Sequence, residues 1–277
     1  MITMQVRVAV LFIAAACGPA AASGWQQAVS NKPSVAVLLA RLHSQDDVER
    51  STAFEGLRSN PAALQSPKVR AALLDLLDRE NQVLDAKLLQ AQNSSQEDKG
   101  DAVGEGYAEY YSNVLGAVDS FADWNDPRQA CILVSAGSSP DSTFATEVAR
   151  HGKTTIPCLI RRSQSEVEAN RSVAVPMLVQ ALATQKNNLD SGTVETARQT
   201  ILKALRDPHV MLRSFTVAAL STFGEADMIP MLKDVAKTDP EFSKESNSYW
   251  IRVAANKAVA AIQKRAVAAP PTVTPHR

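Results

Sequence analysis

Apolar residues recur along most of the chain at the spacing of one face of an α-helix. Val35, Leu38, Leu39 and Leu42 follow the steps i, i+3, i+4 and i+7. The same spacing continues in Val69, Ala72, Leu73, Leu76 and Leu77, in Ile251, Ala254, Ala255, Ala258, Val259 and Ile262, and in Leu212, Phe215, Ala219 and Phe223 beside Leu220. This period predicts amphipathic helices, whereas the alternation typical of strands is nearly absent. We expect about a dozen helices of roughly 10–20 residues.

Short connectors that contain proline separate the predicted helices. Asp, Asn or Ser directly before Pro is typical of a helix start, because proline fits the first helical turn. Such connectors are Ser59-Asn60-Pro61, Ser66-Pro67, Asp126-Pro127, Ser139-Pro140-Asp141, Asp207-Pro208 and Asp239-Pro240. Residues 93–106, 135–143 and 184–193 form more polar connectors, and the proline-rich tail 266–277 is predicted to be disordered.

The composition supports a helical protein and excludes several classes. Glycine contributes 11 of 277 residues and aromatic residues 5%, while alanine and leucine are abundant, which favours an all-α fold. Collagen, a coiled-coil rod, a disulfide-dense miniprotein and a multi-span membrane protein are excluded. Because 29 basic residues balance 29 acidic ones, a globally basic nucleic-acid binder is excluded too, and no nucleic-acid partner is expected.

The first 22 residues have the parts of a secretory signal peptide. Arg7 is the single charge, Val8–Ala16 is apolar, and the small residues 20–22 fit a cleavage site that ends at Ala22. The apolar stretch is too short to span a membrane, so no span is expected after cleavage. We therefore predict an exported protein, periplasmic or secreted. The alternative is lipoprotein processing at Cys17, which follows Ala14-Ala15-Ala16.

One segment carries a recognisable repeat. Residues 205–232 resemble the HEAT-like (armadillo-type) helical repeat family at Asp207, Pro208, Leu212, Arg213, Ala219, Leu220, Gly224, Ile229, Pro230 and Leu232. A second copy begins at Asp239-Pro240 and continues through Ile251 and Arg252, and 69–77 matches the first helix of the repeat. Ile156-Pro157 and Val175-Pro176 resemble the opening of its second helix.

The resemblance implies a right-handed α-solenoid of stacked helix pairs over residues 25–265. The match is good over 205–262, fair over 33–79 and poor over 93–150, where an irregular middle segment is expected. In this family the arginine near the start of the first helix pairs with the turn aspartate of its own or a neighbouring repeat. The resemblance therefore assigns a structural role to Arg70, Arg213 and Arg252.

Cleavage after Ala22 would leave two cysteines, Cys131 and Cys158. An even number of cysteines in an oxidising compartment permits a disulfide. Two buried free thiols remain the alternative, because spacing alone does not bring their Cα atoms within reach.

Two oppositely charged stretches are candidate partner-binding surfaces. Residues 97–126 contain eight acids and one base, with Asp101, Glu105 and Glu109 on one helical ridge. Residues 149–164 contain Arg150, Lys153, Arg161 and Arg162 and no acid. In the acidic stretch Tyr107, Tyr111, Val114, Val118 and Phe121 share one face, predicted to be core, whereas Tyr110 and Trp124 lie off that line and are predicted to be exposed contacts. Two solvated faces that attract each other remain the alternative.

No catalytic, cofactor-binding or metal-binding motif is found in the sequence. The four histidines form no metal spacing with cysteine or with one another, and no Ca²⁺ loop, phosphate loop, dinucleotide fingerprint or nucleophile elbow is present. The preferred hypothesis is an exported, non-catalytic protein-binding scaffold without a cofactor. One alternative is an enzyme or enzyme-accessory protein, lyase- or chaperone-like, that uses the concave groove of the solenoid. Another is a lipid-anchored envelope structural protein.

Overall fold

The computed structural model describes residues 33–94, 103–137 and 143–268. The chain divides into two units, Met1–Ser34 and Val35–Arg277, and only Pro33 and Ser34 of the first are described. The predicted signal peptide 1–22, Cys17 and Asp101 lie outside the described residues, as does 269–277 of the predicted tail.

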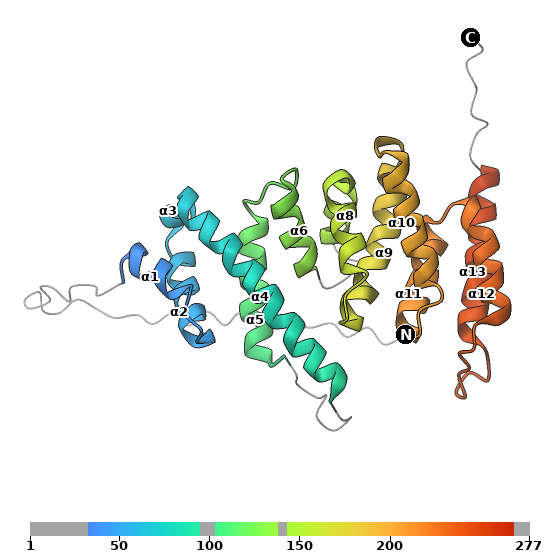
Figure 1. The fold of residues 1–277 in the computed structure, drawn as a ribbon, viewed down its shortest axis with the longest axis horizontal. Coiled ribbons are helices and arrows are strands. Elements are labelled where there is room, and N and C mark those ends of the chain that lie inside the picture. Colours follow the sequence, from blue (N-terminus) through green and yellow to red (C-terminus); the bar gives the residue numbers. More distant parts are fainter. Residues whose placement is uncertain (1–32, 95–102, 138–142, 269–277) are drawn as a thin grey trace, which may run out of the picture. The chain divides into compact units, whose positions relative to one another are not determined.

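The described part of the chain is helical, which confirms the all-α prediction (Figure 1). Its α-helices are α1 Val35–Arg41, α2 Asp47–Arg58, α3 Pro61–Leu64, α4 Pro67–Asn93, α5 Glu105–Asp119, α6 Pro127–Ala136, α7 Thr143–Arg150, α8 Gly152–Arg162, α9 Glu168–Gln185, α10 Ser191–Ala204, α11 Val210–Phe223, α12 Ile229–Thr238 and α13 Trp250–Ala268. Two 3-10 helices, η2 Lys186–Asn188 and η3 Ala226–Met228, adjoin α9 and α12. The described residues hold no β-strand, only one antiparallel bridge between Ser243 and Ser248.

Two of the predicted start signals work as helix caps. Asn60 and Asp126 each accept a backbone N–H from the first turn of the helix that follows, as do Asp46 and Asp190, which the dipeptide pattern did not single out. Ser66 makes no side-chain cap bond, Pro208 lies before the N-cap of α11, and Asp239-Pro240 follow α12 rather than start a helix. Ser139-Pro140-Asp141 lies outside the described residues. Prolines begin α3, α4 and α6, and Pro230 lies in the first turn of α12, as predicted.

Two of the predicted helix openings are wrong. Pro157 and Pro176 lie inside α8 and α9, because both helices begin well before the proline. At the other end, α13 continues to Ala268, three residues past the predicted solenoid limit at 265.

The helices share one apolar core that includes residues of every helix from α1 to α13. Helix α9 is its most enclosed element: Ala174, Val175, Pro176, Met177, Leu178 and Val179 are all buried. It packs against α7, α8, α10 and α11, and α11 in turn packs against α13.

On α11 the buried face is Leu212, Thr216, Val217 and Leu220. The predicted core stripe is therefore wrong for Phe215 and Phe223, which are exposed. Phe215 lies about 130° around the helix from the centre of that face, and Phe223 is the last residue of the helix.

An arginine occupies the fourth position of four helices and makes the same contact each time. Arg50, Arg171 and Arg213 each donate from Nη1 to the two backbone carbonyls before the N-cap, and Arg70 donates from Nε to Leu64 O. The Nε of three of these arginines lies near a carboxylate of a later element. Arg50 meets Glu80, Arg171 meets Asp207, and Arg213 meets Asp239. The carbonyl bonds close the turn before each of the four helices, and in α2, α9 and α11 the carboxylate ties that turn to a later element.

A disulfide joins Cys131 of α6 to Cys158 of α8, with their Cα atoms 5.2 Å apart. Cys158 is buried and Cys131 is half-buried, so the bond lies at the contact between the two helices. It fixes that contact covalently, in addition to the apolar packing of Ile132, Leu133 and Leu159.

Candidate functional site

Helix α4 carries two consecutive polar residues into the core. Glu80 is fully buried and its Oε1 accepts from Arg50 Nε at 2.7 Å, while Tyr107 and Tyr110 donate their hydroxyls to the same carboxylate at 2.9 and 3.2 Å. Asn81 accepts from the Tyr111 hydroxyl and donates to Ile132 O at 2.9 Å. These bonds satisfy the buried polar groups and tie α4 to α2, α5 and α6.

The three tyrosines are held as neutral phenols. Burial, with the nearby Glu80 carboxylate, raises the pKa of Tyr107 and Tyr110 well above the ordinary value. Burial also raises the pKa of Tyr111. A neutral hydroxyl can donate to a carboxylate, so the raised pKa values preserve the network.

Further along the same face of α4, polar side chains bond to α9. Asn170 donates to Asp85 Oδ1 at 2.7 Å and accepts from Arg162 Nη2 at 3.1 Å. Near the end of α4, Gln92 accepts from Glu168 N at 2.8 Å and donates to Glu166 O at 3.3 Å. The last turns of this 27-residue helix are thereby fixed beside the first turn of α9.

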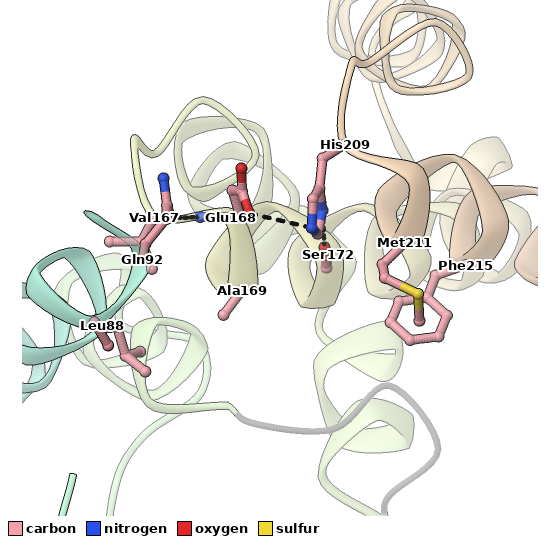
Figure 2. Close-up of a pocket in the computed structure, with 10 residues that line it drawn as sticks. Leu88, Gln92, Val167, Glu168, Ala169, Ser172, His209, Met211 and Phe215 are labelled. Carbon is pink, nitrogen blue, oxygen red and sulfur yellow. Dashed lines mark hydrogen bonds and ion pairs between the residues drawn. The ribbon is translucent and has the colours of Figure 1, made fainter. Parts of the chain in front are cut away.

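A groove of about 570 Å³ opens between the C-terminal end of α4, the start of α9 and the start of α11. Figure 2 shows Leu88 and Gln92 on the α4 side, Glu168, Ala169 and Ser172 on α9, and Met211 and Phe215 on α11. Ala91, Val167 and His209 complete the lining. Met211 is 40% and Phe215 38% exposed, so two large apolar side chains face solvent here.

His209 is the polar centre of the groove. Its Nε2 lies 3.1 Å from Glu168 Oε2 and its Nδ1 lies 3.5 Å from Ser172 Oγ (Figure 2). His209 is the N-cap residue of α11, and its backbone N–H donates to Asp207 Oδ1 at 2.8 Å, which fixes the turn that carries it. The His209 side chain makes no cap bond to α11 and bridges the start of this helix to α9.

The groove combines an apolar lining with one carboxylate, one imidazole and one hydroxyl. Such a surface suits burial of apolar side chains with a polar group for orientation. The three polar residues also match the parts of a nucleophilic site. Ser172 is the nucleophile type, His209 the base beside it, and Glu168 the acid that orients the base. Ser172 is only 5% exposed, however, which limits access to its hydroxyl.

The two aromatic residues predicted to be exposed are buried. Tyr110 packs edge-on against Phe54 and bonds to Glu80, because α2 and α4 cover that side of α5. Trp124 stacks on His151 with ring centroids 5.8 Å apart and meets Phe144 edge-on.

Of the face of α5 predicted to be core, Tyr111, Val114 and Val118 are buried, whereas Tyr107 and Phe121 are half-buried.

The charged candidates divide between surface and interior. Glu105 and Glu109 are exposed on α5, and Arg150, Lys153 and Arg161 are exposed on α7 and α8. Arg162 points inward and donates to Val134 O, and burial lowers the pKa of its guanidinium to about 10. Among the ion pairs of the described helices, none joins the acidic ridge to the basic stretch; Arg150 pairs with Glu147 on its own helix.

The groove residues were missed by the sequence reasoning. They come from three segments spread over more than a hundred positions of the chain, and the sequence placed Phe215 in the core rather than on a surface. One signal was available: apart from Arg213, α11 contains no charged residue, so its solvent face is uncharged.

Within 33–94, 103–137 and 143–268, no cluster of His, Cys, Asp and Glu is arranged to hold a metal ion. No helix in those ranges is both long and apolar enough to cross a membrane. Neither a protein-family model nor a curated protein matches the chain.

Proposed function

We propose that this protein is an exported, non-catalytic scaffold of HEAT-like helix pairs, stacked as a right-handed solenoid, that binds another protein through the groove between α4, α9 and α11. The observation that carries the binding role is the exposure of Met211 and Phe215 beside an apolar lining. Large apolar residues that gather on a surface mark interaction sites.

The recurring arginines support the repeat assignment. Arg171, Arg213 and Arg252 follow one another at intervals of about 40 residues, the length of one HEAT-like repeat. Arg213 pairs with Asp239 at the next repeat's turn, and Arg252 donates to Asp239 O at 2.6 Å. From α5 to α8 no arginine occupies the fourth helical position in the described residues, in keeping with a less regular middle segment.

The disulfide between Cys131 and Cys158 supports export, since such bonds persist mainly in oxidising compartments. Mass spectrometry of the mature N-terminus tests the route. A free Ser23 is expected. A diacylated Cys17 would instead make the protein a lipid-anchored component of the envelope.

Site-specific crosslinking in the native host tests the scaffold function. A photo-crosslinking amino acid at position 215 should capture one dominant protein partner. The matched control carries it at position 242, where Phe242 is 43% exposed but does not line the groove. Equal capture from both positions, or none from position 215, would contradict a binding role for the groove.

The contact among Ser172, His209 and Glu168 favours one second candidate, a serine hydrolase that uses the same groove. Ser172 Oγ would attack an ester carbonyl while His209 takes its proton, and His209 would return that proton to the alcohol that leaves. Water would then hydrolyse the acyl-serine to a carboxylic acid and restore the Ser172 hydroxyl. A fluorophosphonate probe tests this directly. Labelling that is lost in Ser172→Ala would support the hydrolase, whereas an unlabelled native chain would exclude it.

A further inference from the structure

The outward face of α11 is uncharged over its whole length. Met211, Phe215, Ala218 and Thr222 are exposed at steps of i, i+4, i+7 and i+11. The only charged residue of this helix, Arg213, is 6% exposed and bonded to Asp239. Surface helices normally carry charge on the solvent side, so this face resembles one that is covered by another element.

A second row of the same kind lies across the groove. Leu88 and Ala91 of α4 are one helical turn apart, as Met211 and Phe215 are on α11. Ala169 of α9 lies between the two rows, and its small side chain leaves depth there (Figure 2). Two apolar rows at helical spacing, with a small residue between them, form a seat into which the side-chain ridge of a third helix can pack.

The formal charge of the groove lining is of one sign, negative. Glu168 is the only carboxylate in it, no lysine or arginine lines it, and the Glu168 side chain is 38% exposed at the rim. A basic side chain on the occupant would gain a charge-assisted contact here, whereas an acidic one would be repelled.

We propose that the groove binds an amphipathic helix of the partner protein, with apolar side chains one turn apart between the α4 and α11 rows and a lysine or arginine against Glu168. This assignment rests on the proposed scaffold function and specifies the chemistry of its partner. The apolar contacts supply the affinity, and Glu168 selects the charge and the direction of the helix.

Synthetic helices test the proposal with the mature chain. The probe is a side-chain-stapled, alanine-based peptide of about 15 residues, with leucines at i, i+4 and i+7 and one lysine at the next turn. Its matched control has glutamate in place of the lysine, and a third peptide has the leucines scrambled around the helix. Fluorescence anisotropy should show the lysine peptide binding about fivefold more tightly than the glutamate peptide at low salt, and the scrambled peptide not binding.

Three variants locate the site. Phe215→Ser should weaken binding of the lysine peptide about tenfold, while Phe242→Ser leaves it unchanged. Glu168→Gln keeps an oxygen for His209 and should remove the preference for lysine over glutamate. Thermal unfolding by circular dichroism verifies that each variant is folded. Equal binding of all three peptides, or binding that Phe215→Ser does not alter, would overturn the proposal.

The two levels of the hypothesis fail differently. If position 215 crosslinks a partner in the host but no helical peptide binds, the scaffold function stands and the helix assignment is wrong. If the peptides bind as expected and position 215 captures no partner, the groove has the proposed chemistry and the scaffold function is wrong.

Discussion

Arg213 of α11 and Asp239, the C-cap residue of α12, form an ion pair inside the protein, with Nε and Oδ2 2.7 Å apart and both side chains less than a tenth exposed. The arginine also donates to Asp207 O and Pro208 O at 2.9 and 3.0 Å. One side chain therefore holds both the turn before its own helix and the C-terminal end of α12. Removal of either partner would leave a buried charge without compensation.

We expect Arg213→Ala to lower the free energy of unfolding by about 3–5 kcal/mol, because Asp239 would remain buried and unpaired. Urea denaturation followed by circular dichroism measures this. The matched control is Arg206→Ala, since Arg206 and Asp234 pair on the surface with side chains 65% and 47% exposed. That change should cost less than about 1 kcal/mol. Similar decreases in the free energy of unfolding of the two variants would show that the buried pair contributes no more to stability than the surface pair.

Stability should fall at alkaline pH through Tyr107, Tyr110 and Tyr111, whose pKa values are raised by burial. Since the unfolded chain loses these protons first, their contribution is complete below about pH 10 and is lost as the pH rises through the folded-state values. Absorbance at 295 nm should show three phenols still protonated at about pH 11 in the native chain, and all ionised in denaturant. Ionisation of all four tyrosines near pH 10 in the native state would contradict the buried network.

Reduction of the Cys131–Cys158 bond should lower the free energy of unfolding by about 3 kcal/mol, because it frees a loop with a sequence separation of 27. The double variant Cys131→Ala/Cys158→Ala should show the same loss, and its stability should no longer respond to dithiothreitol. A native chain whose melting temperature is unchanged by dithiothreitol, with reduction verified by mass spectrometry, would refute a stabilising bond.

Gly224, the C-cap of α11, should not tolerate a side chain. A Cβ there would lie 2.4 Å from Leu220 O and 3.0 Å from Ile262, so Gly224→Ala should destabilise the protein by about 1–3 kcal/mol. Gly116→Ala is the control, because a Cβ at this position in α5 meets nothing within 4 Å. It should stabilise the protein by roughly 0.5–1 kcal/mol through helix propensity. In thermal unfolding, the melting temperature should fall for Gly224→Ala and rise for Gly116→Ala. Equal shifts in the two variants would contradict the close contact at Gly224.

Local signals predicted the helices well, because a cap needs only a few neighbouring residues. Asp126-Pro127 begins α6 as the dipeptide suggests, and Arg213 pairs with the Asp239 side chain. Arg70 and Arg252 make no such pair, because they donate to the backbone carbonyls of Leu64 and Asp239. Pro157 was misleading, since proline marks a helix start only where the chain before it is not already helical.

Positions that depend on distant partners were not predictable from spacing. Tyr110 lies off the apolar stripe of α5 but is buried, because Glu80 of α4 accepts its hydroxyl. Phe215 shares a helical stripe with Leu212 but is exposed, because no described element covers that side of α11. The groove depends on the end of α4 meeting α9, a contact made by Gln92 that no periodicity encodes.

The Cys131–Cys158 disulfide between α6 and α8 has a consequence for proteolysis. A single backbone cut anywhere between Cys131 and Cys158 leaves two fragments that remain covalently joined. The nicked chain would migrate as two pieces on a reducing gel and as one on a non-reducing gel. A protein with this bond can therefore survive an attack in that stretch without separating into its halves.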